Sequence, residues 1–227
     1  MATIIKKFRL YGPKNFLLFS LLEIKRQFLK FFQHSYSQHG EDLIIQKISR
    51  NNLRTFIDIG SNHPQRFNNT YHFYRLGARG VNLDPNQSLI KLFKKFRPED
   101  ISLPYGVGLK NETKIFYQMD PDVDSSFDFQ HTQQRIQAGC TVEKKYPAQI
   151  ITLADIFKKY FPKKPVDLLN IDTEGYDYLI LKSNDWSKYR PQIICIEDNS
   201  LATKKLLQQH NYQLVATTPL NSIYVLN

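Results

Sequence analysis

Polar residues follow three short apolar runs of this sequence, at the points where buried strands would end. The residues there that could do chemistry are Asp58, Gly60, Ser61, Asn62, His63, Asp84, Asp172 and Glu174. Ligands of parallel α/β sheets bind at the carboxyl ends of the strands. A glycine there lets a ligand approach the backbone, and a carboxylate accepts hydrogen bonds from a ribose diol. The order of these residues along the chain therefore indicates a ligand that contains a nucleoside.

The turn after the first apolar run disfavours a pyrophosphate. Dinucleotide-binding turns carry Gly-x-Gly-x-x-Gly, whereas Gly60 is followed by no second or third glycine at that spacing. A nucleotide-dependent oxidoreductase is therefore disfavoured. S-adenosylmethionine contains no phosphate and tolerates bulkier residues at the turn. Its sulfonium charge is also compatible with nearby carboxylates such as Asp58 and Asp172.

These side chains need a sheet to position them, and the sequence predicts one from Thr55 onward. The expected strands are 55–59, 80–83, 101–107, 166–171 and 192–196, alternating with helices 71–76, 87–96, 153–161, 176–182 and 201–210. Consecutive strand–helix units predict a parallel sheet with helices on both faces. Two closing strands, 213–216 and 223–226, predict an antiparallel edge. The polar segment 110–150 is expected as loop with a short helix, and as the segment that selects the substrate.

The composition fits one domain with a packed core, since 41% of the 227 residues are apolar and 23% are charged. Two cysteines, Cys140 and Cys195, exclude a disulfide framework and a four-thiolate zinc site, and reduced thiols fit a cytoplasmic location. The uncharged stretch 15–22 has eight residues, whereas a membrane-spanning helix needs about 20. No aromatic and basic strand pattern is present, so no nucleic-acid partner is expected.

The positive charge gathers at the start of the sequence. Residues 1–33 contain seven Lys or Arg and one Glu, which gives +6 of the formal net charge of +10. Apolar side chains recur at helical spacing over 15–33 and predict an amphipathic helix. This helix either caps the core or lies on anionic lipid. Peripheral contact with the inner face of a membrane is therefore a second expectation.

A series of motifs occurs in order between about residues 36 and 198. They are Ser37–Asp42, Phe56–Pro64, Asn69–Tyr71, Asn82–Asn86, Phe96–Ile101, Ile171–Asp177 and Asn184–Trp186. This series resembles the FkbM-type S-adenosylmethionine-dependent methyltransferases. The resemblance implies a Rossmann-like methyltransferase domain over 36–227, with a mostly parallel seven-stranded sheet and an antiparallel C-terminal edge. Residues 1–35 then form a separate basic helical extension.

The same resemblance implies roles for individual residues, with S-adenosylmethionine as the cofactor. The cofactor-binding residues that it implies are Gln38, Glu41, Asp58, Gly60, Ser61, Asn62, Asp84 and Asp172. Asp84 would hold the ribose, and Gln38 with Glu41 would close the pocket from the N-terminal side. Two positions depart from the family pattern. Ser61 stands where Ala is more common, and Asp84 stands where Glu is frequent.

The reaction that the resemblance implies is methyl transfer to a hydroxyl, which needs positioning and the removal of one proton. Asp172, Glu174 and His63 are the candidate catalytic residues. Asp172 ranks first as the base because it ends a central strand, while Glu174 is expected to cap the next helix. His63 also fits a structural role beside Pro64, and Asp58 fits a turn cap. Asp172 and Glu174 could instead bind a divalent metal, but they lack a clear third ligand, so a site without metal is the leading expectation.

The acceptor is expected to be a small molecule or a glycan, with O-methylation of a sugar hydroxyl as the leading hypothesis. The alternative from another class is a non-catalytic cofactor-binding or membrane-docking protein that uses the basic N-terminal helix. Deletion of residues 1–33 separates these hypotheses, because an enzyme keeps its cofactor binding without the helix.

Overall fold

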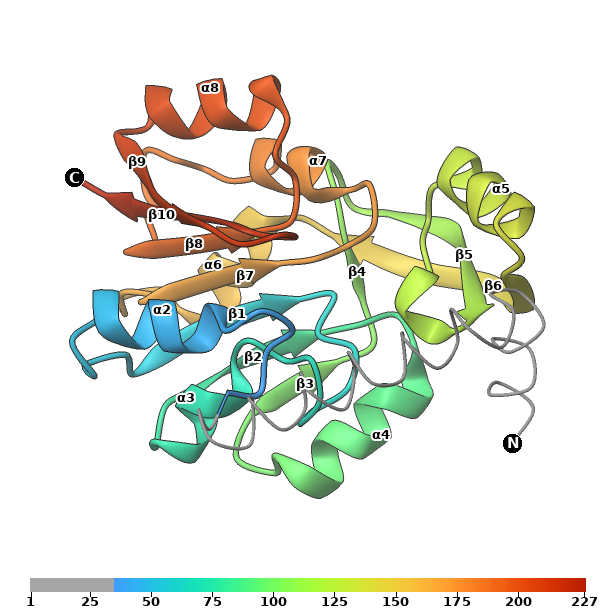
Figure 1. Ribbon diagram of the computed structural model, residues 1–227, viewed down its shortest axis with the longest axis horizontal. Helices are drawn as coiled ribbons and strands as arrows, with labels where there is room; N and C mark the ends of the chain where they lie inside the picture. Colours follow the sequence, from blue (N-terminus) through green and yellow to red (C-terminus); the bar gives the residue numbers. More distant parts are fainter. Residues whose placement is uncertain (1–34) are drawn as a thin grey trace, which may run out of the picture.

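The computed structural model describes residues 35–227, so the basic helix expected within 1–33 lies outside the described residues. The described chain forms a large seven-stranded sheet and a small three-stranded sheet (Figure 1). The strands of the large sheet are β1 (Thr55–Ile59), β2 (Arg79–Leu83), β3 (Ile101–Leu103), β7 (Leu168–Ile171), β8 (Ile193–Ile196), β9 (Tyr212–Thr217) and β10 (Ser222–Leu226). The small sheet consists of β4 (Gly106–Val107), β5 (Glu112–Asp120) and β6 (Thr141–Ile151).

Local sequence signals explain where several helices begin. The described helices are α2 (Glu41–Ile48), α3 (Tyr71–Arg75), α4 (Gln87–Phe96), α5 (Phe129–Gln137), α6 (Leu153–Tyr160), α7 (Asp177–Lys182), α8 (Leu201–Gln209) and the 3₁₀ turn η1 (Asp122–Asp124). The side chain of Asn86 accepts a backbone N–H at the start of α4, and Thr152 does so for α6. Ser200 caps α8 in the same way. Such caps satisfy N–H groups that have no partner within the helix.

The large sheet has the strand order β3-β2-β1-β7-β8-β10-β9. β1 pairs in parallel with β2 and with β7, whereas β10 runs antiparallel to both of its neighbours. This arrangement confirms the predicted α/β fold with a mostly parallel seven-stranded sheet and an antiparallel C-terminal edge. The chain moves outward in one direction from β1 and in the other from β7. The carboxyl ends of β1 and β7 therefore form the switch point where ligands bind in such sheets.

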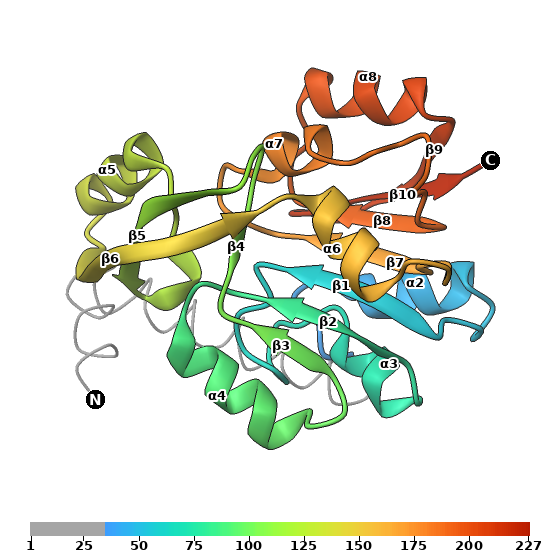
Figure 2. The same cartoon turned by 180° about the vertical axis from the view of Figure 1, so that it is seen from behind.

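Helices lie on both faces of the large sheet (Figure 2), and buried side chains form a core on each face. On one face, α2 and α3 cover the strands through Ile45, Phe73, Phe56, Leu168 and Ile193. On the other face, α6, α7 and α8 cover them through Ile156, Leu181, Leu207, Ile57, Leu169 and Ile194. Successive strand residues point to opposite faces. Asp58, two residues after Phe56, therefore points to the face that α2 and α3 cover.

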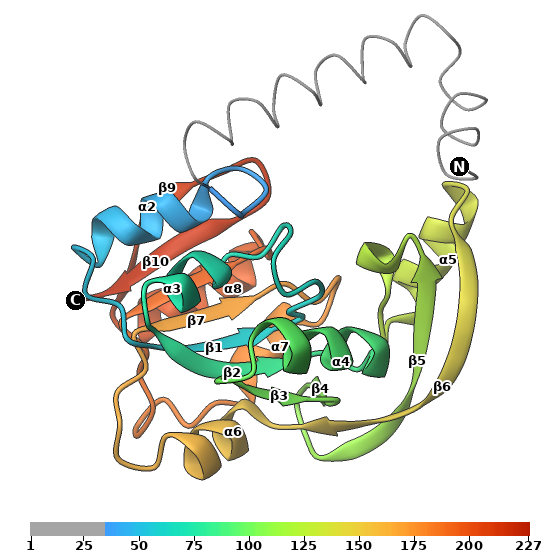
Figure 3. The same cartoon turned by 90° about the horizontal axis from the view of Figure 1, so that it is seen from below.

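The expectation of loop for 110–150 is wrong for most of that segment. β5 and β6 form a long antiparallel hairpin, with register from Glu112 opposite Ile150 to Asp120 opposite Thr141. The expected short helix is present as α5. Figure 3 shows this arm, residues 112–151, curving away from the large sheet.

The single strand expected at 101–107 is two strands. β3 pairs with β2 in the large sheet, whereas β4 pairs with β6 in the small one. Pro104 lies between them and has no N–H to donate to a ladder. Between residues 35 and 227, no helix has the length and apolar character that crossing a bilayer requires.

Candidate active site

A cleft opens at the carboxyl ends of β1, β2, β7 and β8. It contains about 1040 Å³ of space, including open solvent at its mouth. Six of the residues singled out in the sequence line it together: Gln38, Gly60, Asn62, Asp84, Asp172 and Glu174. The first and last of them, Gln38 and Glu174, are more than 130 positions apart in the chain, and the strand order brings all six to one cavity.

The turn after β1 is held by the neighbouring strands. The backbone N–H groups of Gly60 and Ser61 donate to the carbonyl oxygen of Leu83 at 2.9 and 3.1 Å. Gly60 has φ +73°, and a Cβ built on it would lie 1.7 Å from the carbonyl oxygen of Asp172. Any side chain at this position would therefore collide with the end of β7. Glycine is required here by contact between two strand ends as well as by its backbone conformation.

The Asp84 carboxylate joins the turns that follow β1 and β2. It accepts hydrogen bonds from the backbone N–H of Asn62 at 3.0 Å and of Asn86 at 2.8 Å. Burial raises the pKa of Asp84 to about 6, although both hydrogen bonds oppose the shift. A carboxylate has about four lone-pair sites, so two acceptor positions remain. These remaining positions suit a vicinal diol.

The arm supplies the outer wall of the cleft. Tyr146 of β6 donates its hydroxyl to the carbonyl oxygen of Pro85 at 3.3 Å, next to Asp84. On the opposite side, the Ser126 hydroxyl donates to the carbonyl oxygen of Glu174 at 2.8 Å. The arm therefore bridges the β2 and β7 ends of the site. Phe116 and Phe127 of the arm form an aromatic wall of the cleft together with Tyr105 and Tyr176, which lie outside the arm. This group is called the aromatic wall.

Three carboxyl groups converge on the β7 and β8 side of the cleft. Asp172, Glu174 and Glu197 each offer an oxygen, and these oxygens lie within 4.8 Å of one another. Glu197 follows β8 directly and also lines the cleft. It was missing from the residues singled out in the sequence, although it obeys the same rule of a carboxylate at a strand end.

Crowding of these acids changes their protonation. Burial raises the pKa of Asp172 well above its usual range, and the neighbouring charge of Glu197 adds to this. Burial and then Glu197 raise the pKa of Glu174 to about 8. Glu174 therefore holds a proton at neutral pH when no cation is near, and the ionised form of Asp172 is disfavoured. A cation beside them favours their ionised forms. The group thus suits an onium ion and, by its ligand chemistry, also a divalent metal.

Glu174 does not cap the helix that follows it, contrary to expectation. Its carboxylate lies 3.5 Å from Nε2 of His131 in α5. No described side chain caps α7 by a hydrogen bond, and the carboxylate of Asp177, its first residue, accepts the backbone N–H groups of Thr173 at 3.0 Å and Asp198 at 3.1 Å. Glu174 itself has φ +50°, which turns the chain sharply after β7.

Asp58 and Ser61 are buried beneath the cleft and are absent from its lining. The Asp58 carboxylate accepts hydrogen bonds from Thr70, Asn68 and Asn170 at 2.6, 3.2 and 2.9 Å. Ser61 contacts the carbonyl oxygen of Leu83 from its own backbone N–H. Their direct cofactor contact stays a prediction, and the structure gives each of them a role in holding the turn.

Glu41 and His63 also lie outside the lining of the cleft. Glu41 accepts a hydrogen bond from the Thr218 hydroxyl at 2.7 Å and thereby joins the N-terminal segment to the β9–β10 loop. Nδ1 of His63 accepts the backbone N–H groups of Gln65 and Arg66 at 3.1 and 3.2 Å. Burial and the charge of Arg66 lower the pKa of His63. A catalytic role for His63 stays a prediction.

The strand order and the position of the cleft define a Rossmann-like α/β protein whose ligand site lies at the switch point. Residues 58–214 match the family model described as the methyltransferase FkbM domain. The chain therefore belongs to the FkbM methyltransferase family, and its cofactor is S-adenosylmethionine.

Three solved structures match this one at low sequence identity. A candidate caffeoyl-CoA O-methyltransferase from Staphylococcus aureus has 12% identity and a TM-score of 0.48, covering 90% of this chain and 91% of its own. An O-methyltransferase from Bacillus cereus in complex with S-adenosylhomocysteine has 12% identity and a TM-score of 0.40, covering 100% and 98%. TrmK from M. capricolum, bound to the same product, has 14% identity and a TM-score of 0.42, covering 80% and 65%. No curated protein matches the sequence.

Proposed function

We propose that this protein transfers a methyl group from S-adenosylmethionine to a hydroxyl group of a sugar or a similar polar small molecule. The observation that carries the proposal is that one cleft contains both the Asp84 carboxylate and the carboxyl groups of Asp172, Glu174 and Glu197. When bound, S-adenosylmethionine supplies an electrophilic methyl group on a cationic sulfur. The residues present provide acceptors for a ribose diol at one end and acids for a cation at the other.

The donor set of the cleft fits this cofactor. Asp84 keeps two acceptor positions beyond its backbone hydrogen bonds. The same cleft is also lined by Leu89, Tyr105 and Val107, whose apolar surface suits an adenine ring. The acids at the other end suit a sulfonium and an ammonium group, because opposite charges lower the cost of ionising crowded carboxyl groups.

The acceptor would enter against the aromatic wall that the arm completes. Phe127 contacts both Phe116 and Tyr176, with ring centroids 5.0 and 5.8 Å apart. Flat apolar surfaces of this kind stack against sugar rings, while the acids beside them accept hydroxyl protons. Asp172 is the proposed base, with Glu174 and Glu197 as its neighbours. This assignment requires Asp172 to be ionised when the acceptor binds, although its burial and Glu197 disfavour that form.

The test has a binding part and a transfer part. Isothermal titration with S-adenosylhomocysteine should show one site per chain, and complete absence of binding overturns the proposal. Labelled S-adenosylmethionine is then offered with a panel of sugars, nucleotide-sugars and simple phenols. Transfer to a sugar hydroxyl supports the proposal. Transfer only to an amine or a thiol shows that the acceptor class is wrong.

A chelator is expected to leave both binding and turnover unchanged. The proposal assigns the acids at Asp172, Glu174 and Glu197 to a cationic cofactor and a proton, so no divalent ion is required. The measurement compares turnover in EDTA, after dialysis, and with added Mg²⁺. Activity that is lost in EDTA and restored by Mg²⁺ would instead assign these three carboxyl groups to a metal.

Peripheral contact with an anionic membrane is proposed from the +6 charge of residues 1–33. Deletion of these residues should leave affinity for S-adenosylhomocysteine within about twofold, because every described residue that lines the cleft comes after position 37. The same deletion should abolish co-sedimentation with vesicles containing phosphatidylserine, while neutral vesicles serve as the control. Loss of cofactor binding in the truncated chain would contradict the first expectation. If the truncated chain binds the vesicles as well as the full chain does, the second expectation is contradicted.

A further inference from the structure

Arg97, the residue directly after α4, carries a charge that the proposed reaction does not use. Its side chain is fully buried and is among the largest buried side chains of residues 35–227. Burying a charge is costly unless it is paired and hydrogen-bonded. The contacts of Arg97 therefore show which residues compensate its buried charge.

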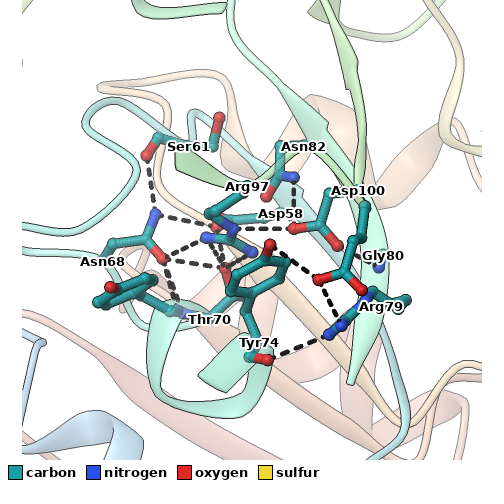
Figure 4. A network of polar contacts seen from close by, with 12 residues as sticks. Asp58, Ser61, Asn68, Thr70, Tyr74, Arg79, Gly80, Asn82, Arg97 and Asp100 are labelled. Carbon is teal, nitrogen blue, oxygen red and sulfur yellow. Dashed lines mark hydrogen bonds and ion pairs between the residues drawn. The ribbon is translucent and has the colours of Figure 1, made fainter. Parts of the chain in front are cut away.

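The guanidinium is bound on every side (Figure 4). Its Nε forms an ion pair with Asp100 at 2.8 Å, and its Nη1 donates to Asn68 at 3.0 Å. Both terminal nitrogens donate to the Thr70 hydroxyl at 3.1 Å. Three aromatic rings lie 5.1 to 5.2 Å from its central carbon, within the range of cation–π attraction, and belong to Phe56, Tyr74 and Phe93.

Asn68 and Thr70 carry this contact to Asp58 on β1. Both residues donate to the same carboxylate oxygen of Asp58, at 3.2 and 2.6 Å. The positive charge of Arg97 favours the ionised form of Asp58 against the effect of burial. One buried cation thus serves two buried carboxylates, Asp58 and Asp100. Lysine could not replace it fully, because an ammonium lacks the planar fork that reaches three acceptors at once.

The same asparagine reaches the turn of the cofactor site. The side-chain amide of Asn68 donates to the backbone carbonyl of Ser61 at 3.0 Å. The next residue, Asn62, has φ +46°, lines the cleft and donates its N–H to Asp84. The turn is therefore held from the cleft by Asp84 and from beneath by Asn68. Without Arg97, the side-chain oxygen of Asn68 would keep the backbone N–H groups of Thr70 and Tyr71, at 3.1 and 2.8 Å, but would lose its one charged donor.

We propose that Arg97 is a positioning residue for the cofactor: its buried guanidinium fixes Asn68 and Thr70 against Asp58, and Asn68 in turn fixes the Ser61–Asn62 turn that lines the cleft. The inference rests on the proposed placement of S-adenosylmethionine in that cleft. Arg97 acts through other residues and touches no part of the cleft lining.

The experiment compares Arg97→Lys and Arg97→Met with the wild type. We expect affinity for S-adenosylhomocysteine to fall at least about tenfold in Arg97→Met and by less in Arg97→Lys, which keeps the charge. The KM for S-adenosylmethionine should rise while kcat at saturating cofactor stays within about twofold, because the turn positions only the cofactor. Amide hydrogen exchange in the free protein should accelerate over 61–70 and remain slow in β7 and β8.

A matched control is Asp167→Ala. Asp167 accepts the backbone N–H groups of Arg54 and Thr55 at 2.7 and 2.9 Å, at the amino end of the same sheet. This variant should lower the melting temperature without changing affinity for S-adenosylhomocysteine. Asn68→Ala combined with Arg97→Met should weaken binding little more than either change alone, since both act through one contact.

The outcomes separate this inference from the proposed function. Wild-type protein that fails to bind S-adenosylhomocysteine overturns the proposed function and this inference together. Wild-type binding with unchanged affinity in both Arg97 variants overturns the inference alone and leaves Arg97 a structural residue. Equal weakening by Asp167→Ala would also overturn it, because loss of stability would then explain the effect. If Arg97→Met does not fold, the Arg97→Lys measurements decide.

Discussion

Asp172→Asn is expected to lower turnover by about 10²–10⁴-fold while affinity for S-adenosylhomocysteine changes much less. The substitution keeps the size of the side chain and removes its capacity to accept a proton. Asp172 ends β7 at the switch point, and its backbone N–H donates to the carbonyl oxygen of Ile59 at 3.0 Å. The position of its side chain is therefore set by two central strands. The measurement is single-turnover methyl transfer at saturating cofactor.

Glu174→Gln is the matched comparison for this prediction. Because the pKa of Glu174 is raised to about 8, its carboxyl group carries a proton at neutral pH, and glutamine resembles that form. We expect a smaller loss of turnover than in Asp172→Asn. A fully active Asp172→Asn beside an inactive Glu174→Gln would reverse the assignment. Activity in both variants would move proton removal to Glu197, to His63 or to solvent.

The pH profile gives an independent check on the base. Burial and the neighbouring charge of Glu197 raise the pKa of Asp172 well above its usual range. Turnover limited by a carboxyl base should rise with pH until that group is ionised. Asp172→Asn should abolish this rise at the pH where the wild type shows it. A rise that persists unchanged in the variant would assign the titration to another group.

Much of the fold follows from local patterns in the sequence, and the arm shows where such patterns end. β1 and β7 are mostly apolar because both of their faces are covered, with Asp58 and Asn170 as polar exceptions, and such strands are typical of central parallel positions. In β6, by contrast, Lys144 and Lys145 are both exposed, and only Ala148 and Ile150 are buried. β6 is held mainly by its ladder with β5. Apolar alternation is limited to Tyr146, Ala148 and Ile150, so the sequence does not mark the first half of the strand.

The candidate site shows the same division between local and long-range information. Asp84 and Asp172 can be predicted as site residues from the sequence, because recognising a carboxylate at a strand end requires only the pattern of that one strand. Glu197 satisfies the same criterion at the end of β8 and could have been chosen on that ground. Asp58 lies close to Gly60 in the chain, yet strand alternation turns it toward Asn68 and Thr70. Applying the two-residue period from Phe56 would have placed it beneath the cleft.

Asp84→Ala is expected to weaken binding of S-adenosylhomocysteine by at least about tenfold. Each hydrogen bond to a charged group contributes roughly 1.5–3 kcal/mol, and a factor of ten in affinity corresponds to about 1.4 kcal/mol. Two ribose hydroxyls lose their acceptor in this variant. The N–H groups of Asn62 and Asn86 lose theirs as well, so the melting temperature of the free protein should also fall. Asp167→Ala provides the control for that loss of stability.

The pH dependence of binding tests the charge of Asp84 directly. Its pKa of about 6 lies above the usual value of 3.8, so the carboxylate is protonated in the free protein below pH 6. Two donated hydroxyl groups favour the ionised form, and binding below pH 6 must therefore release a proton. Affinity should fall by up to about tenfold per pH unit below 6, and the contribution of Asp84 should level off above pH 7. In Asp84→Asn this acid-side slope should become shallower, and a slope as steep as that of the wild type would exclude Asp84 as the ribose acceptor.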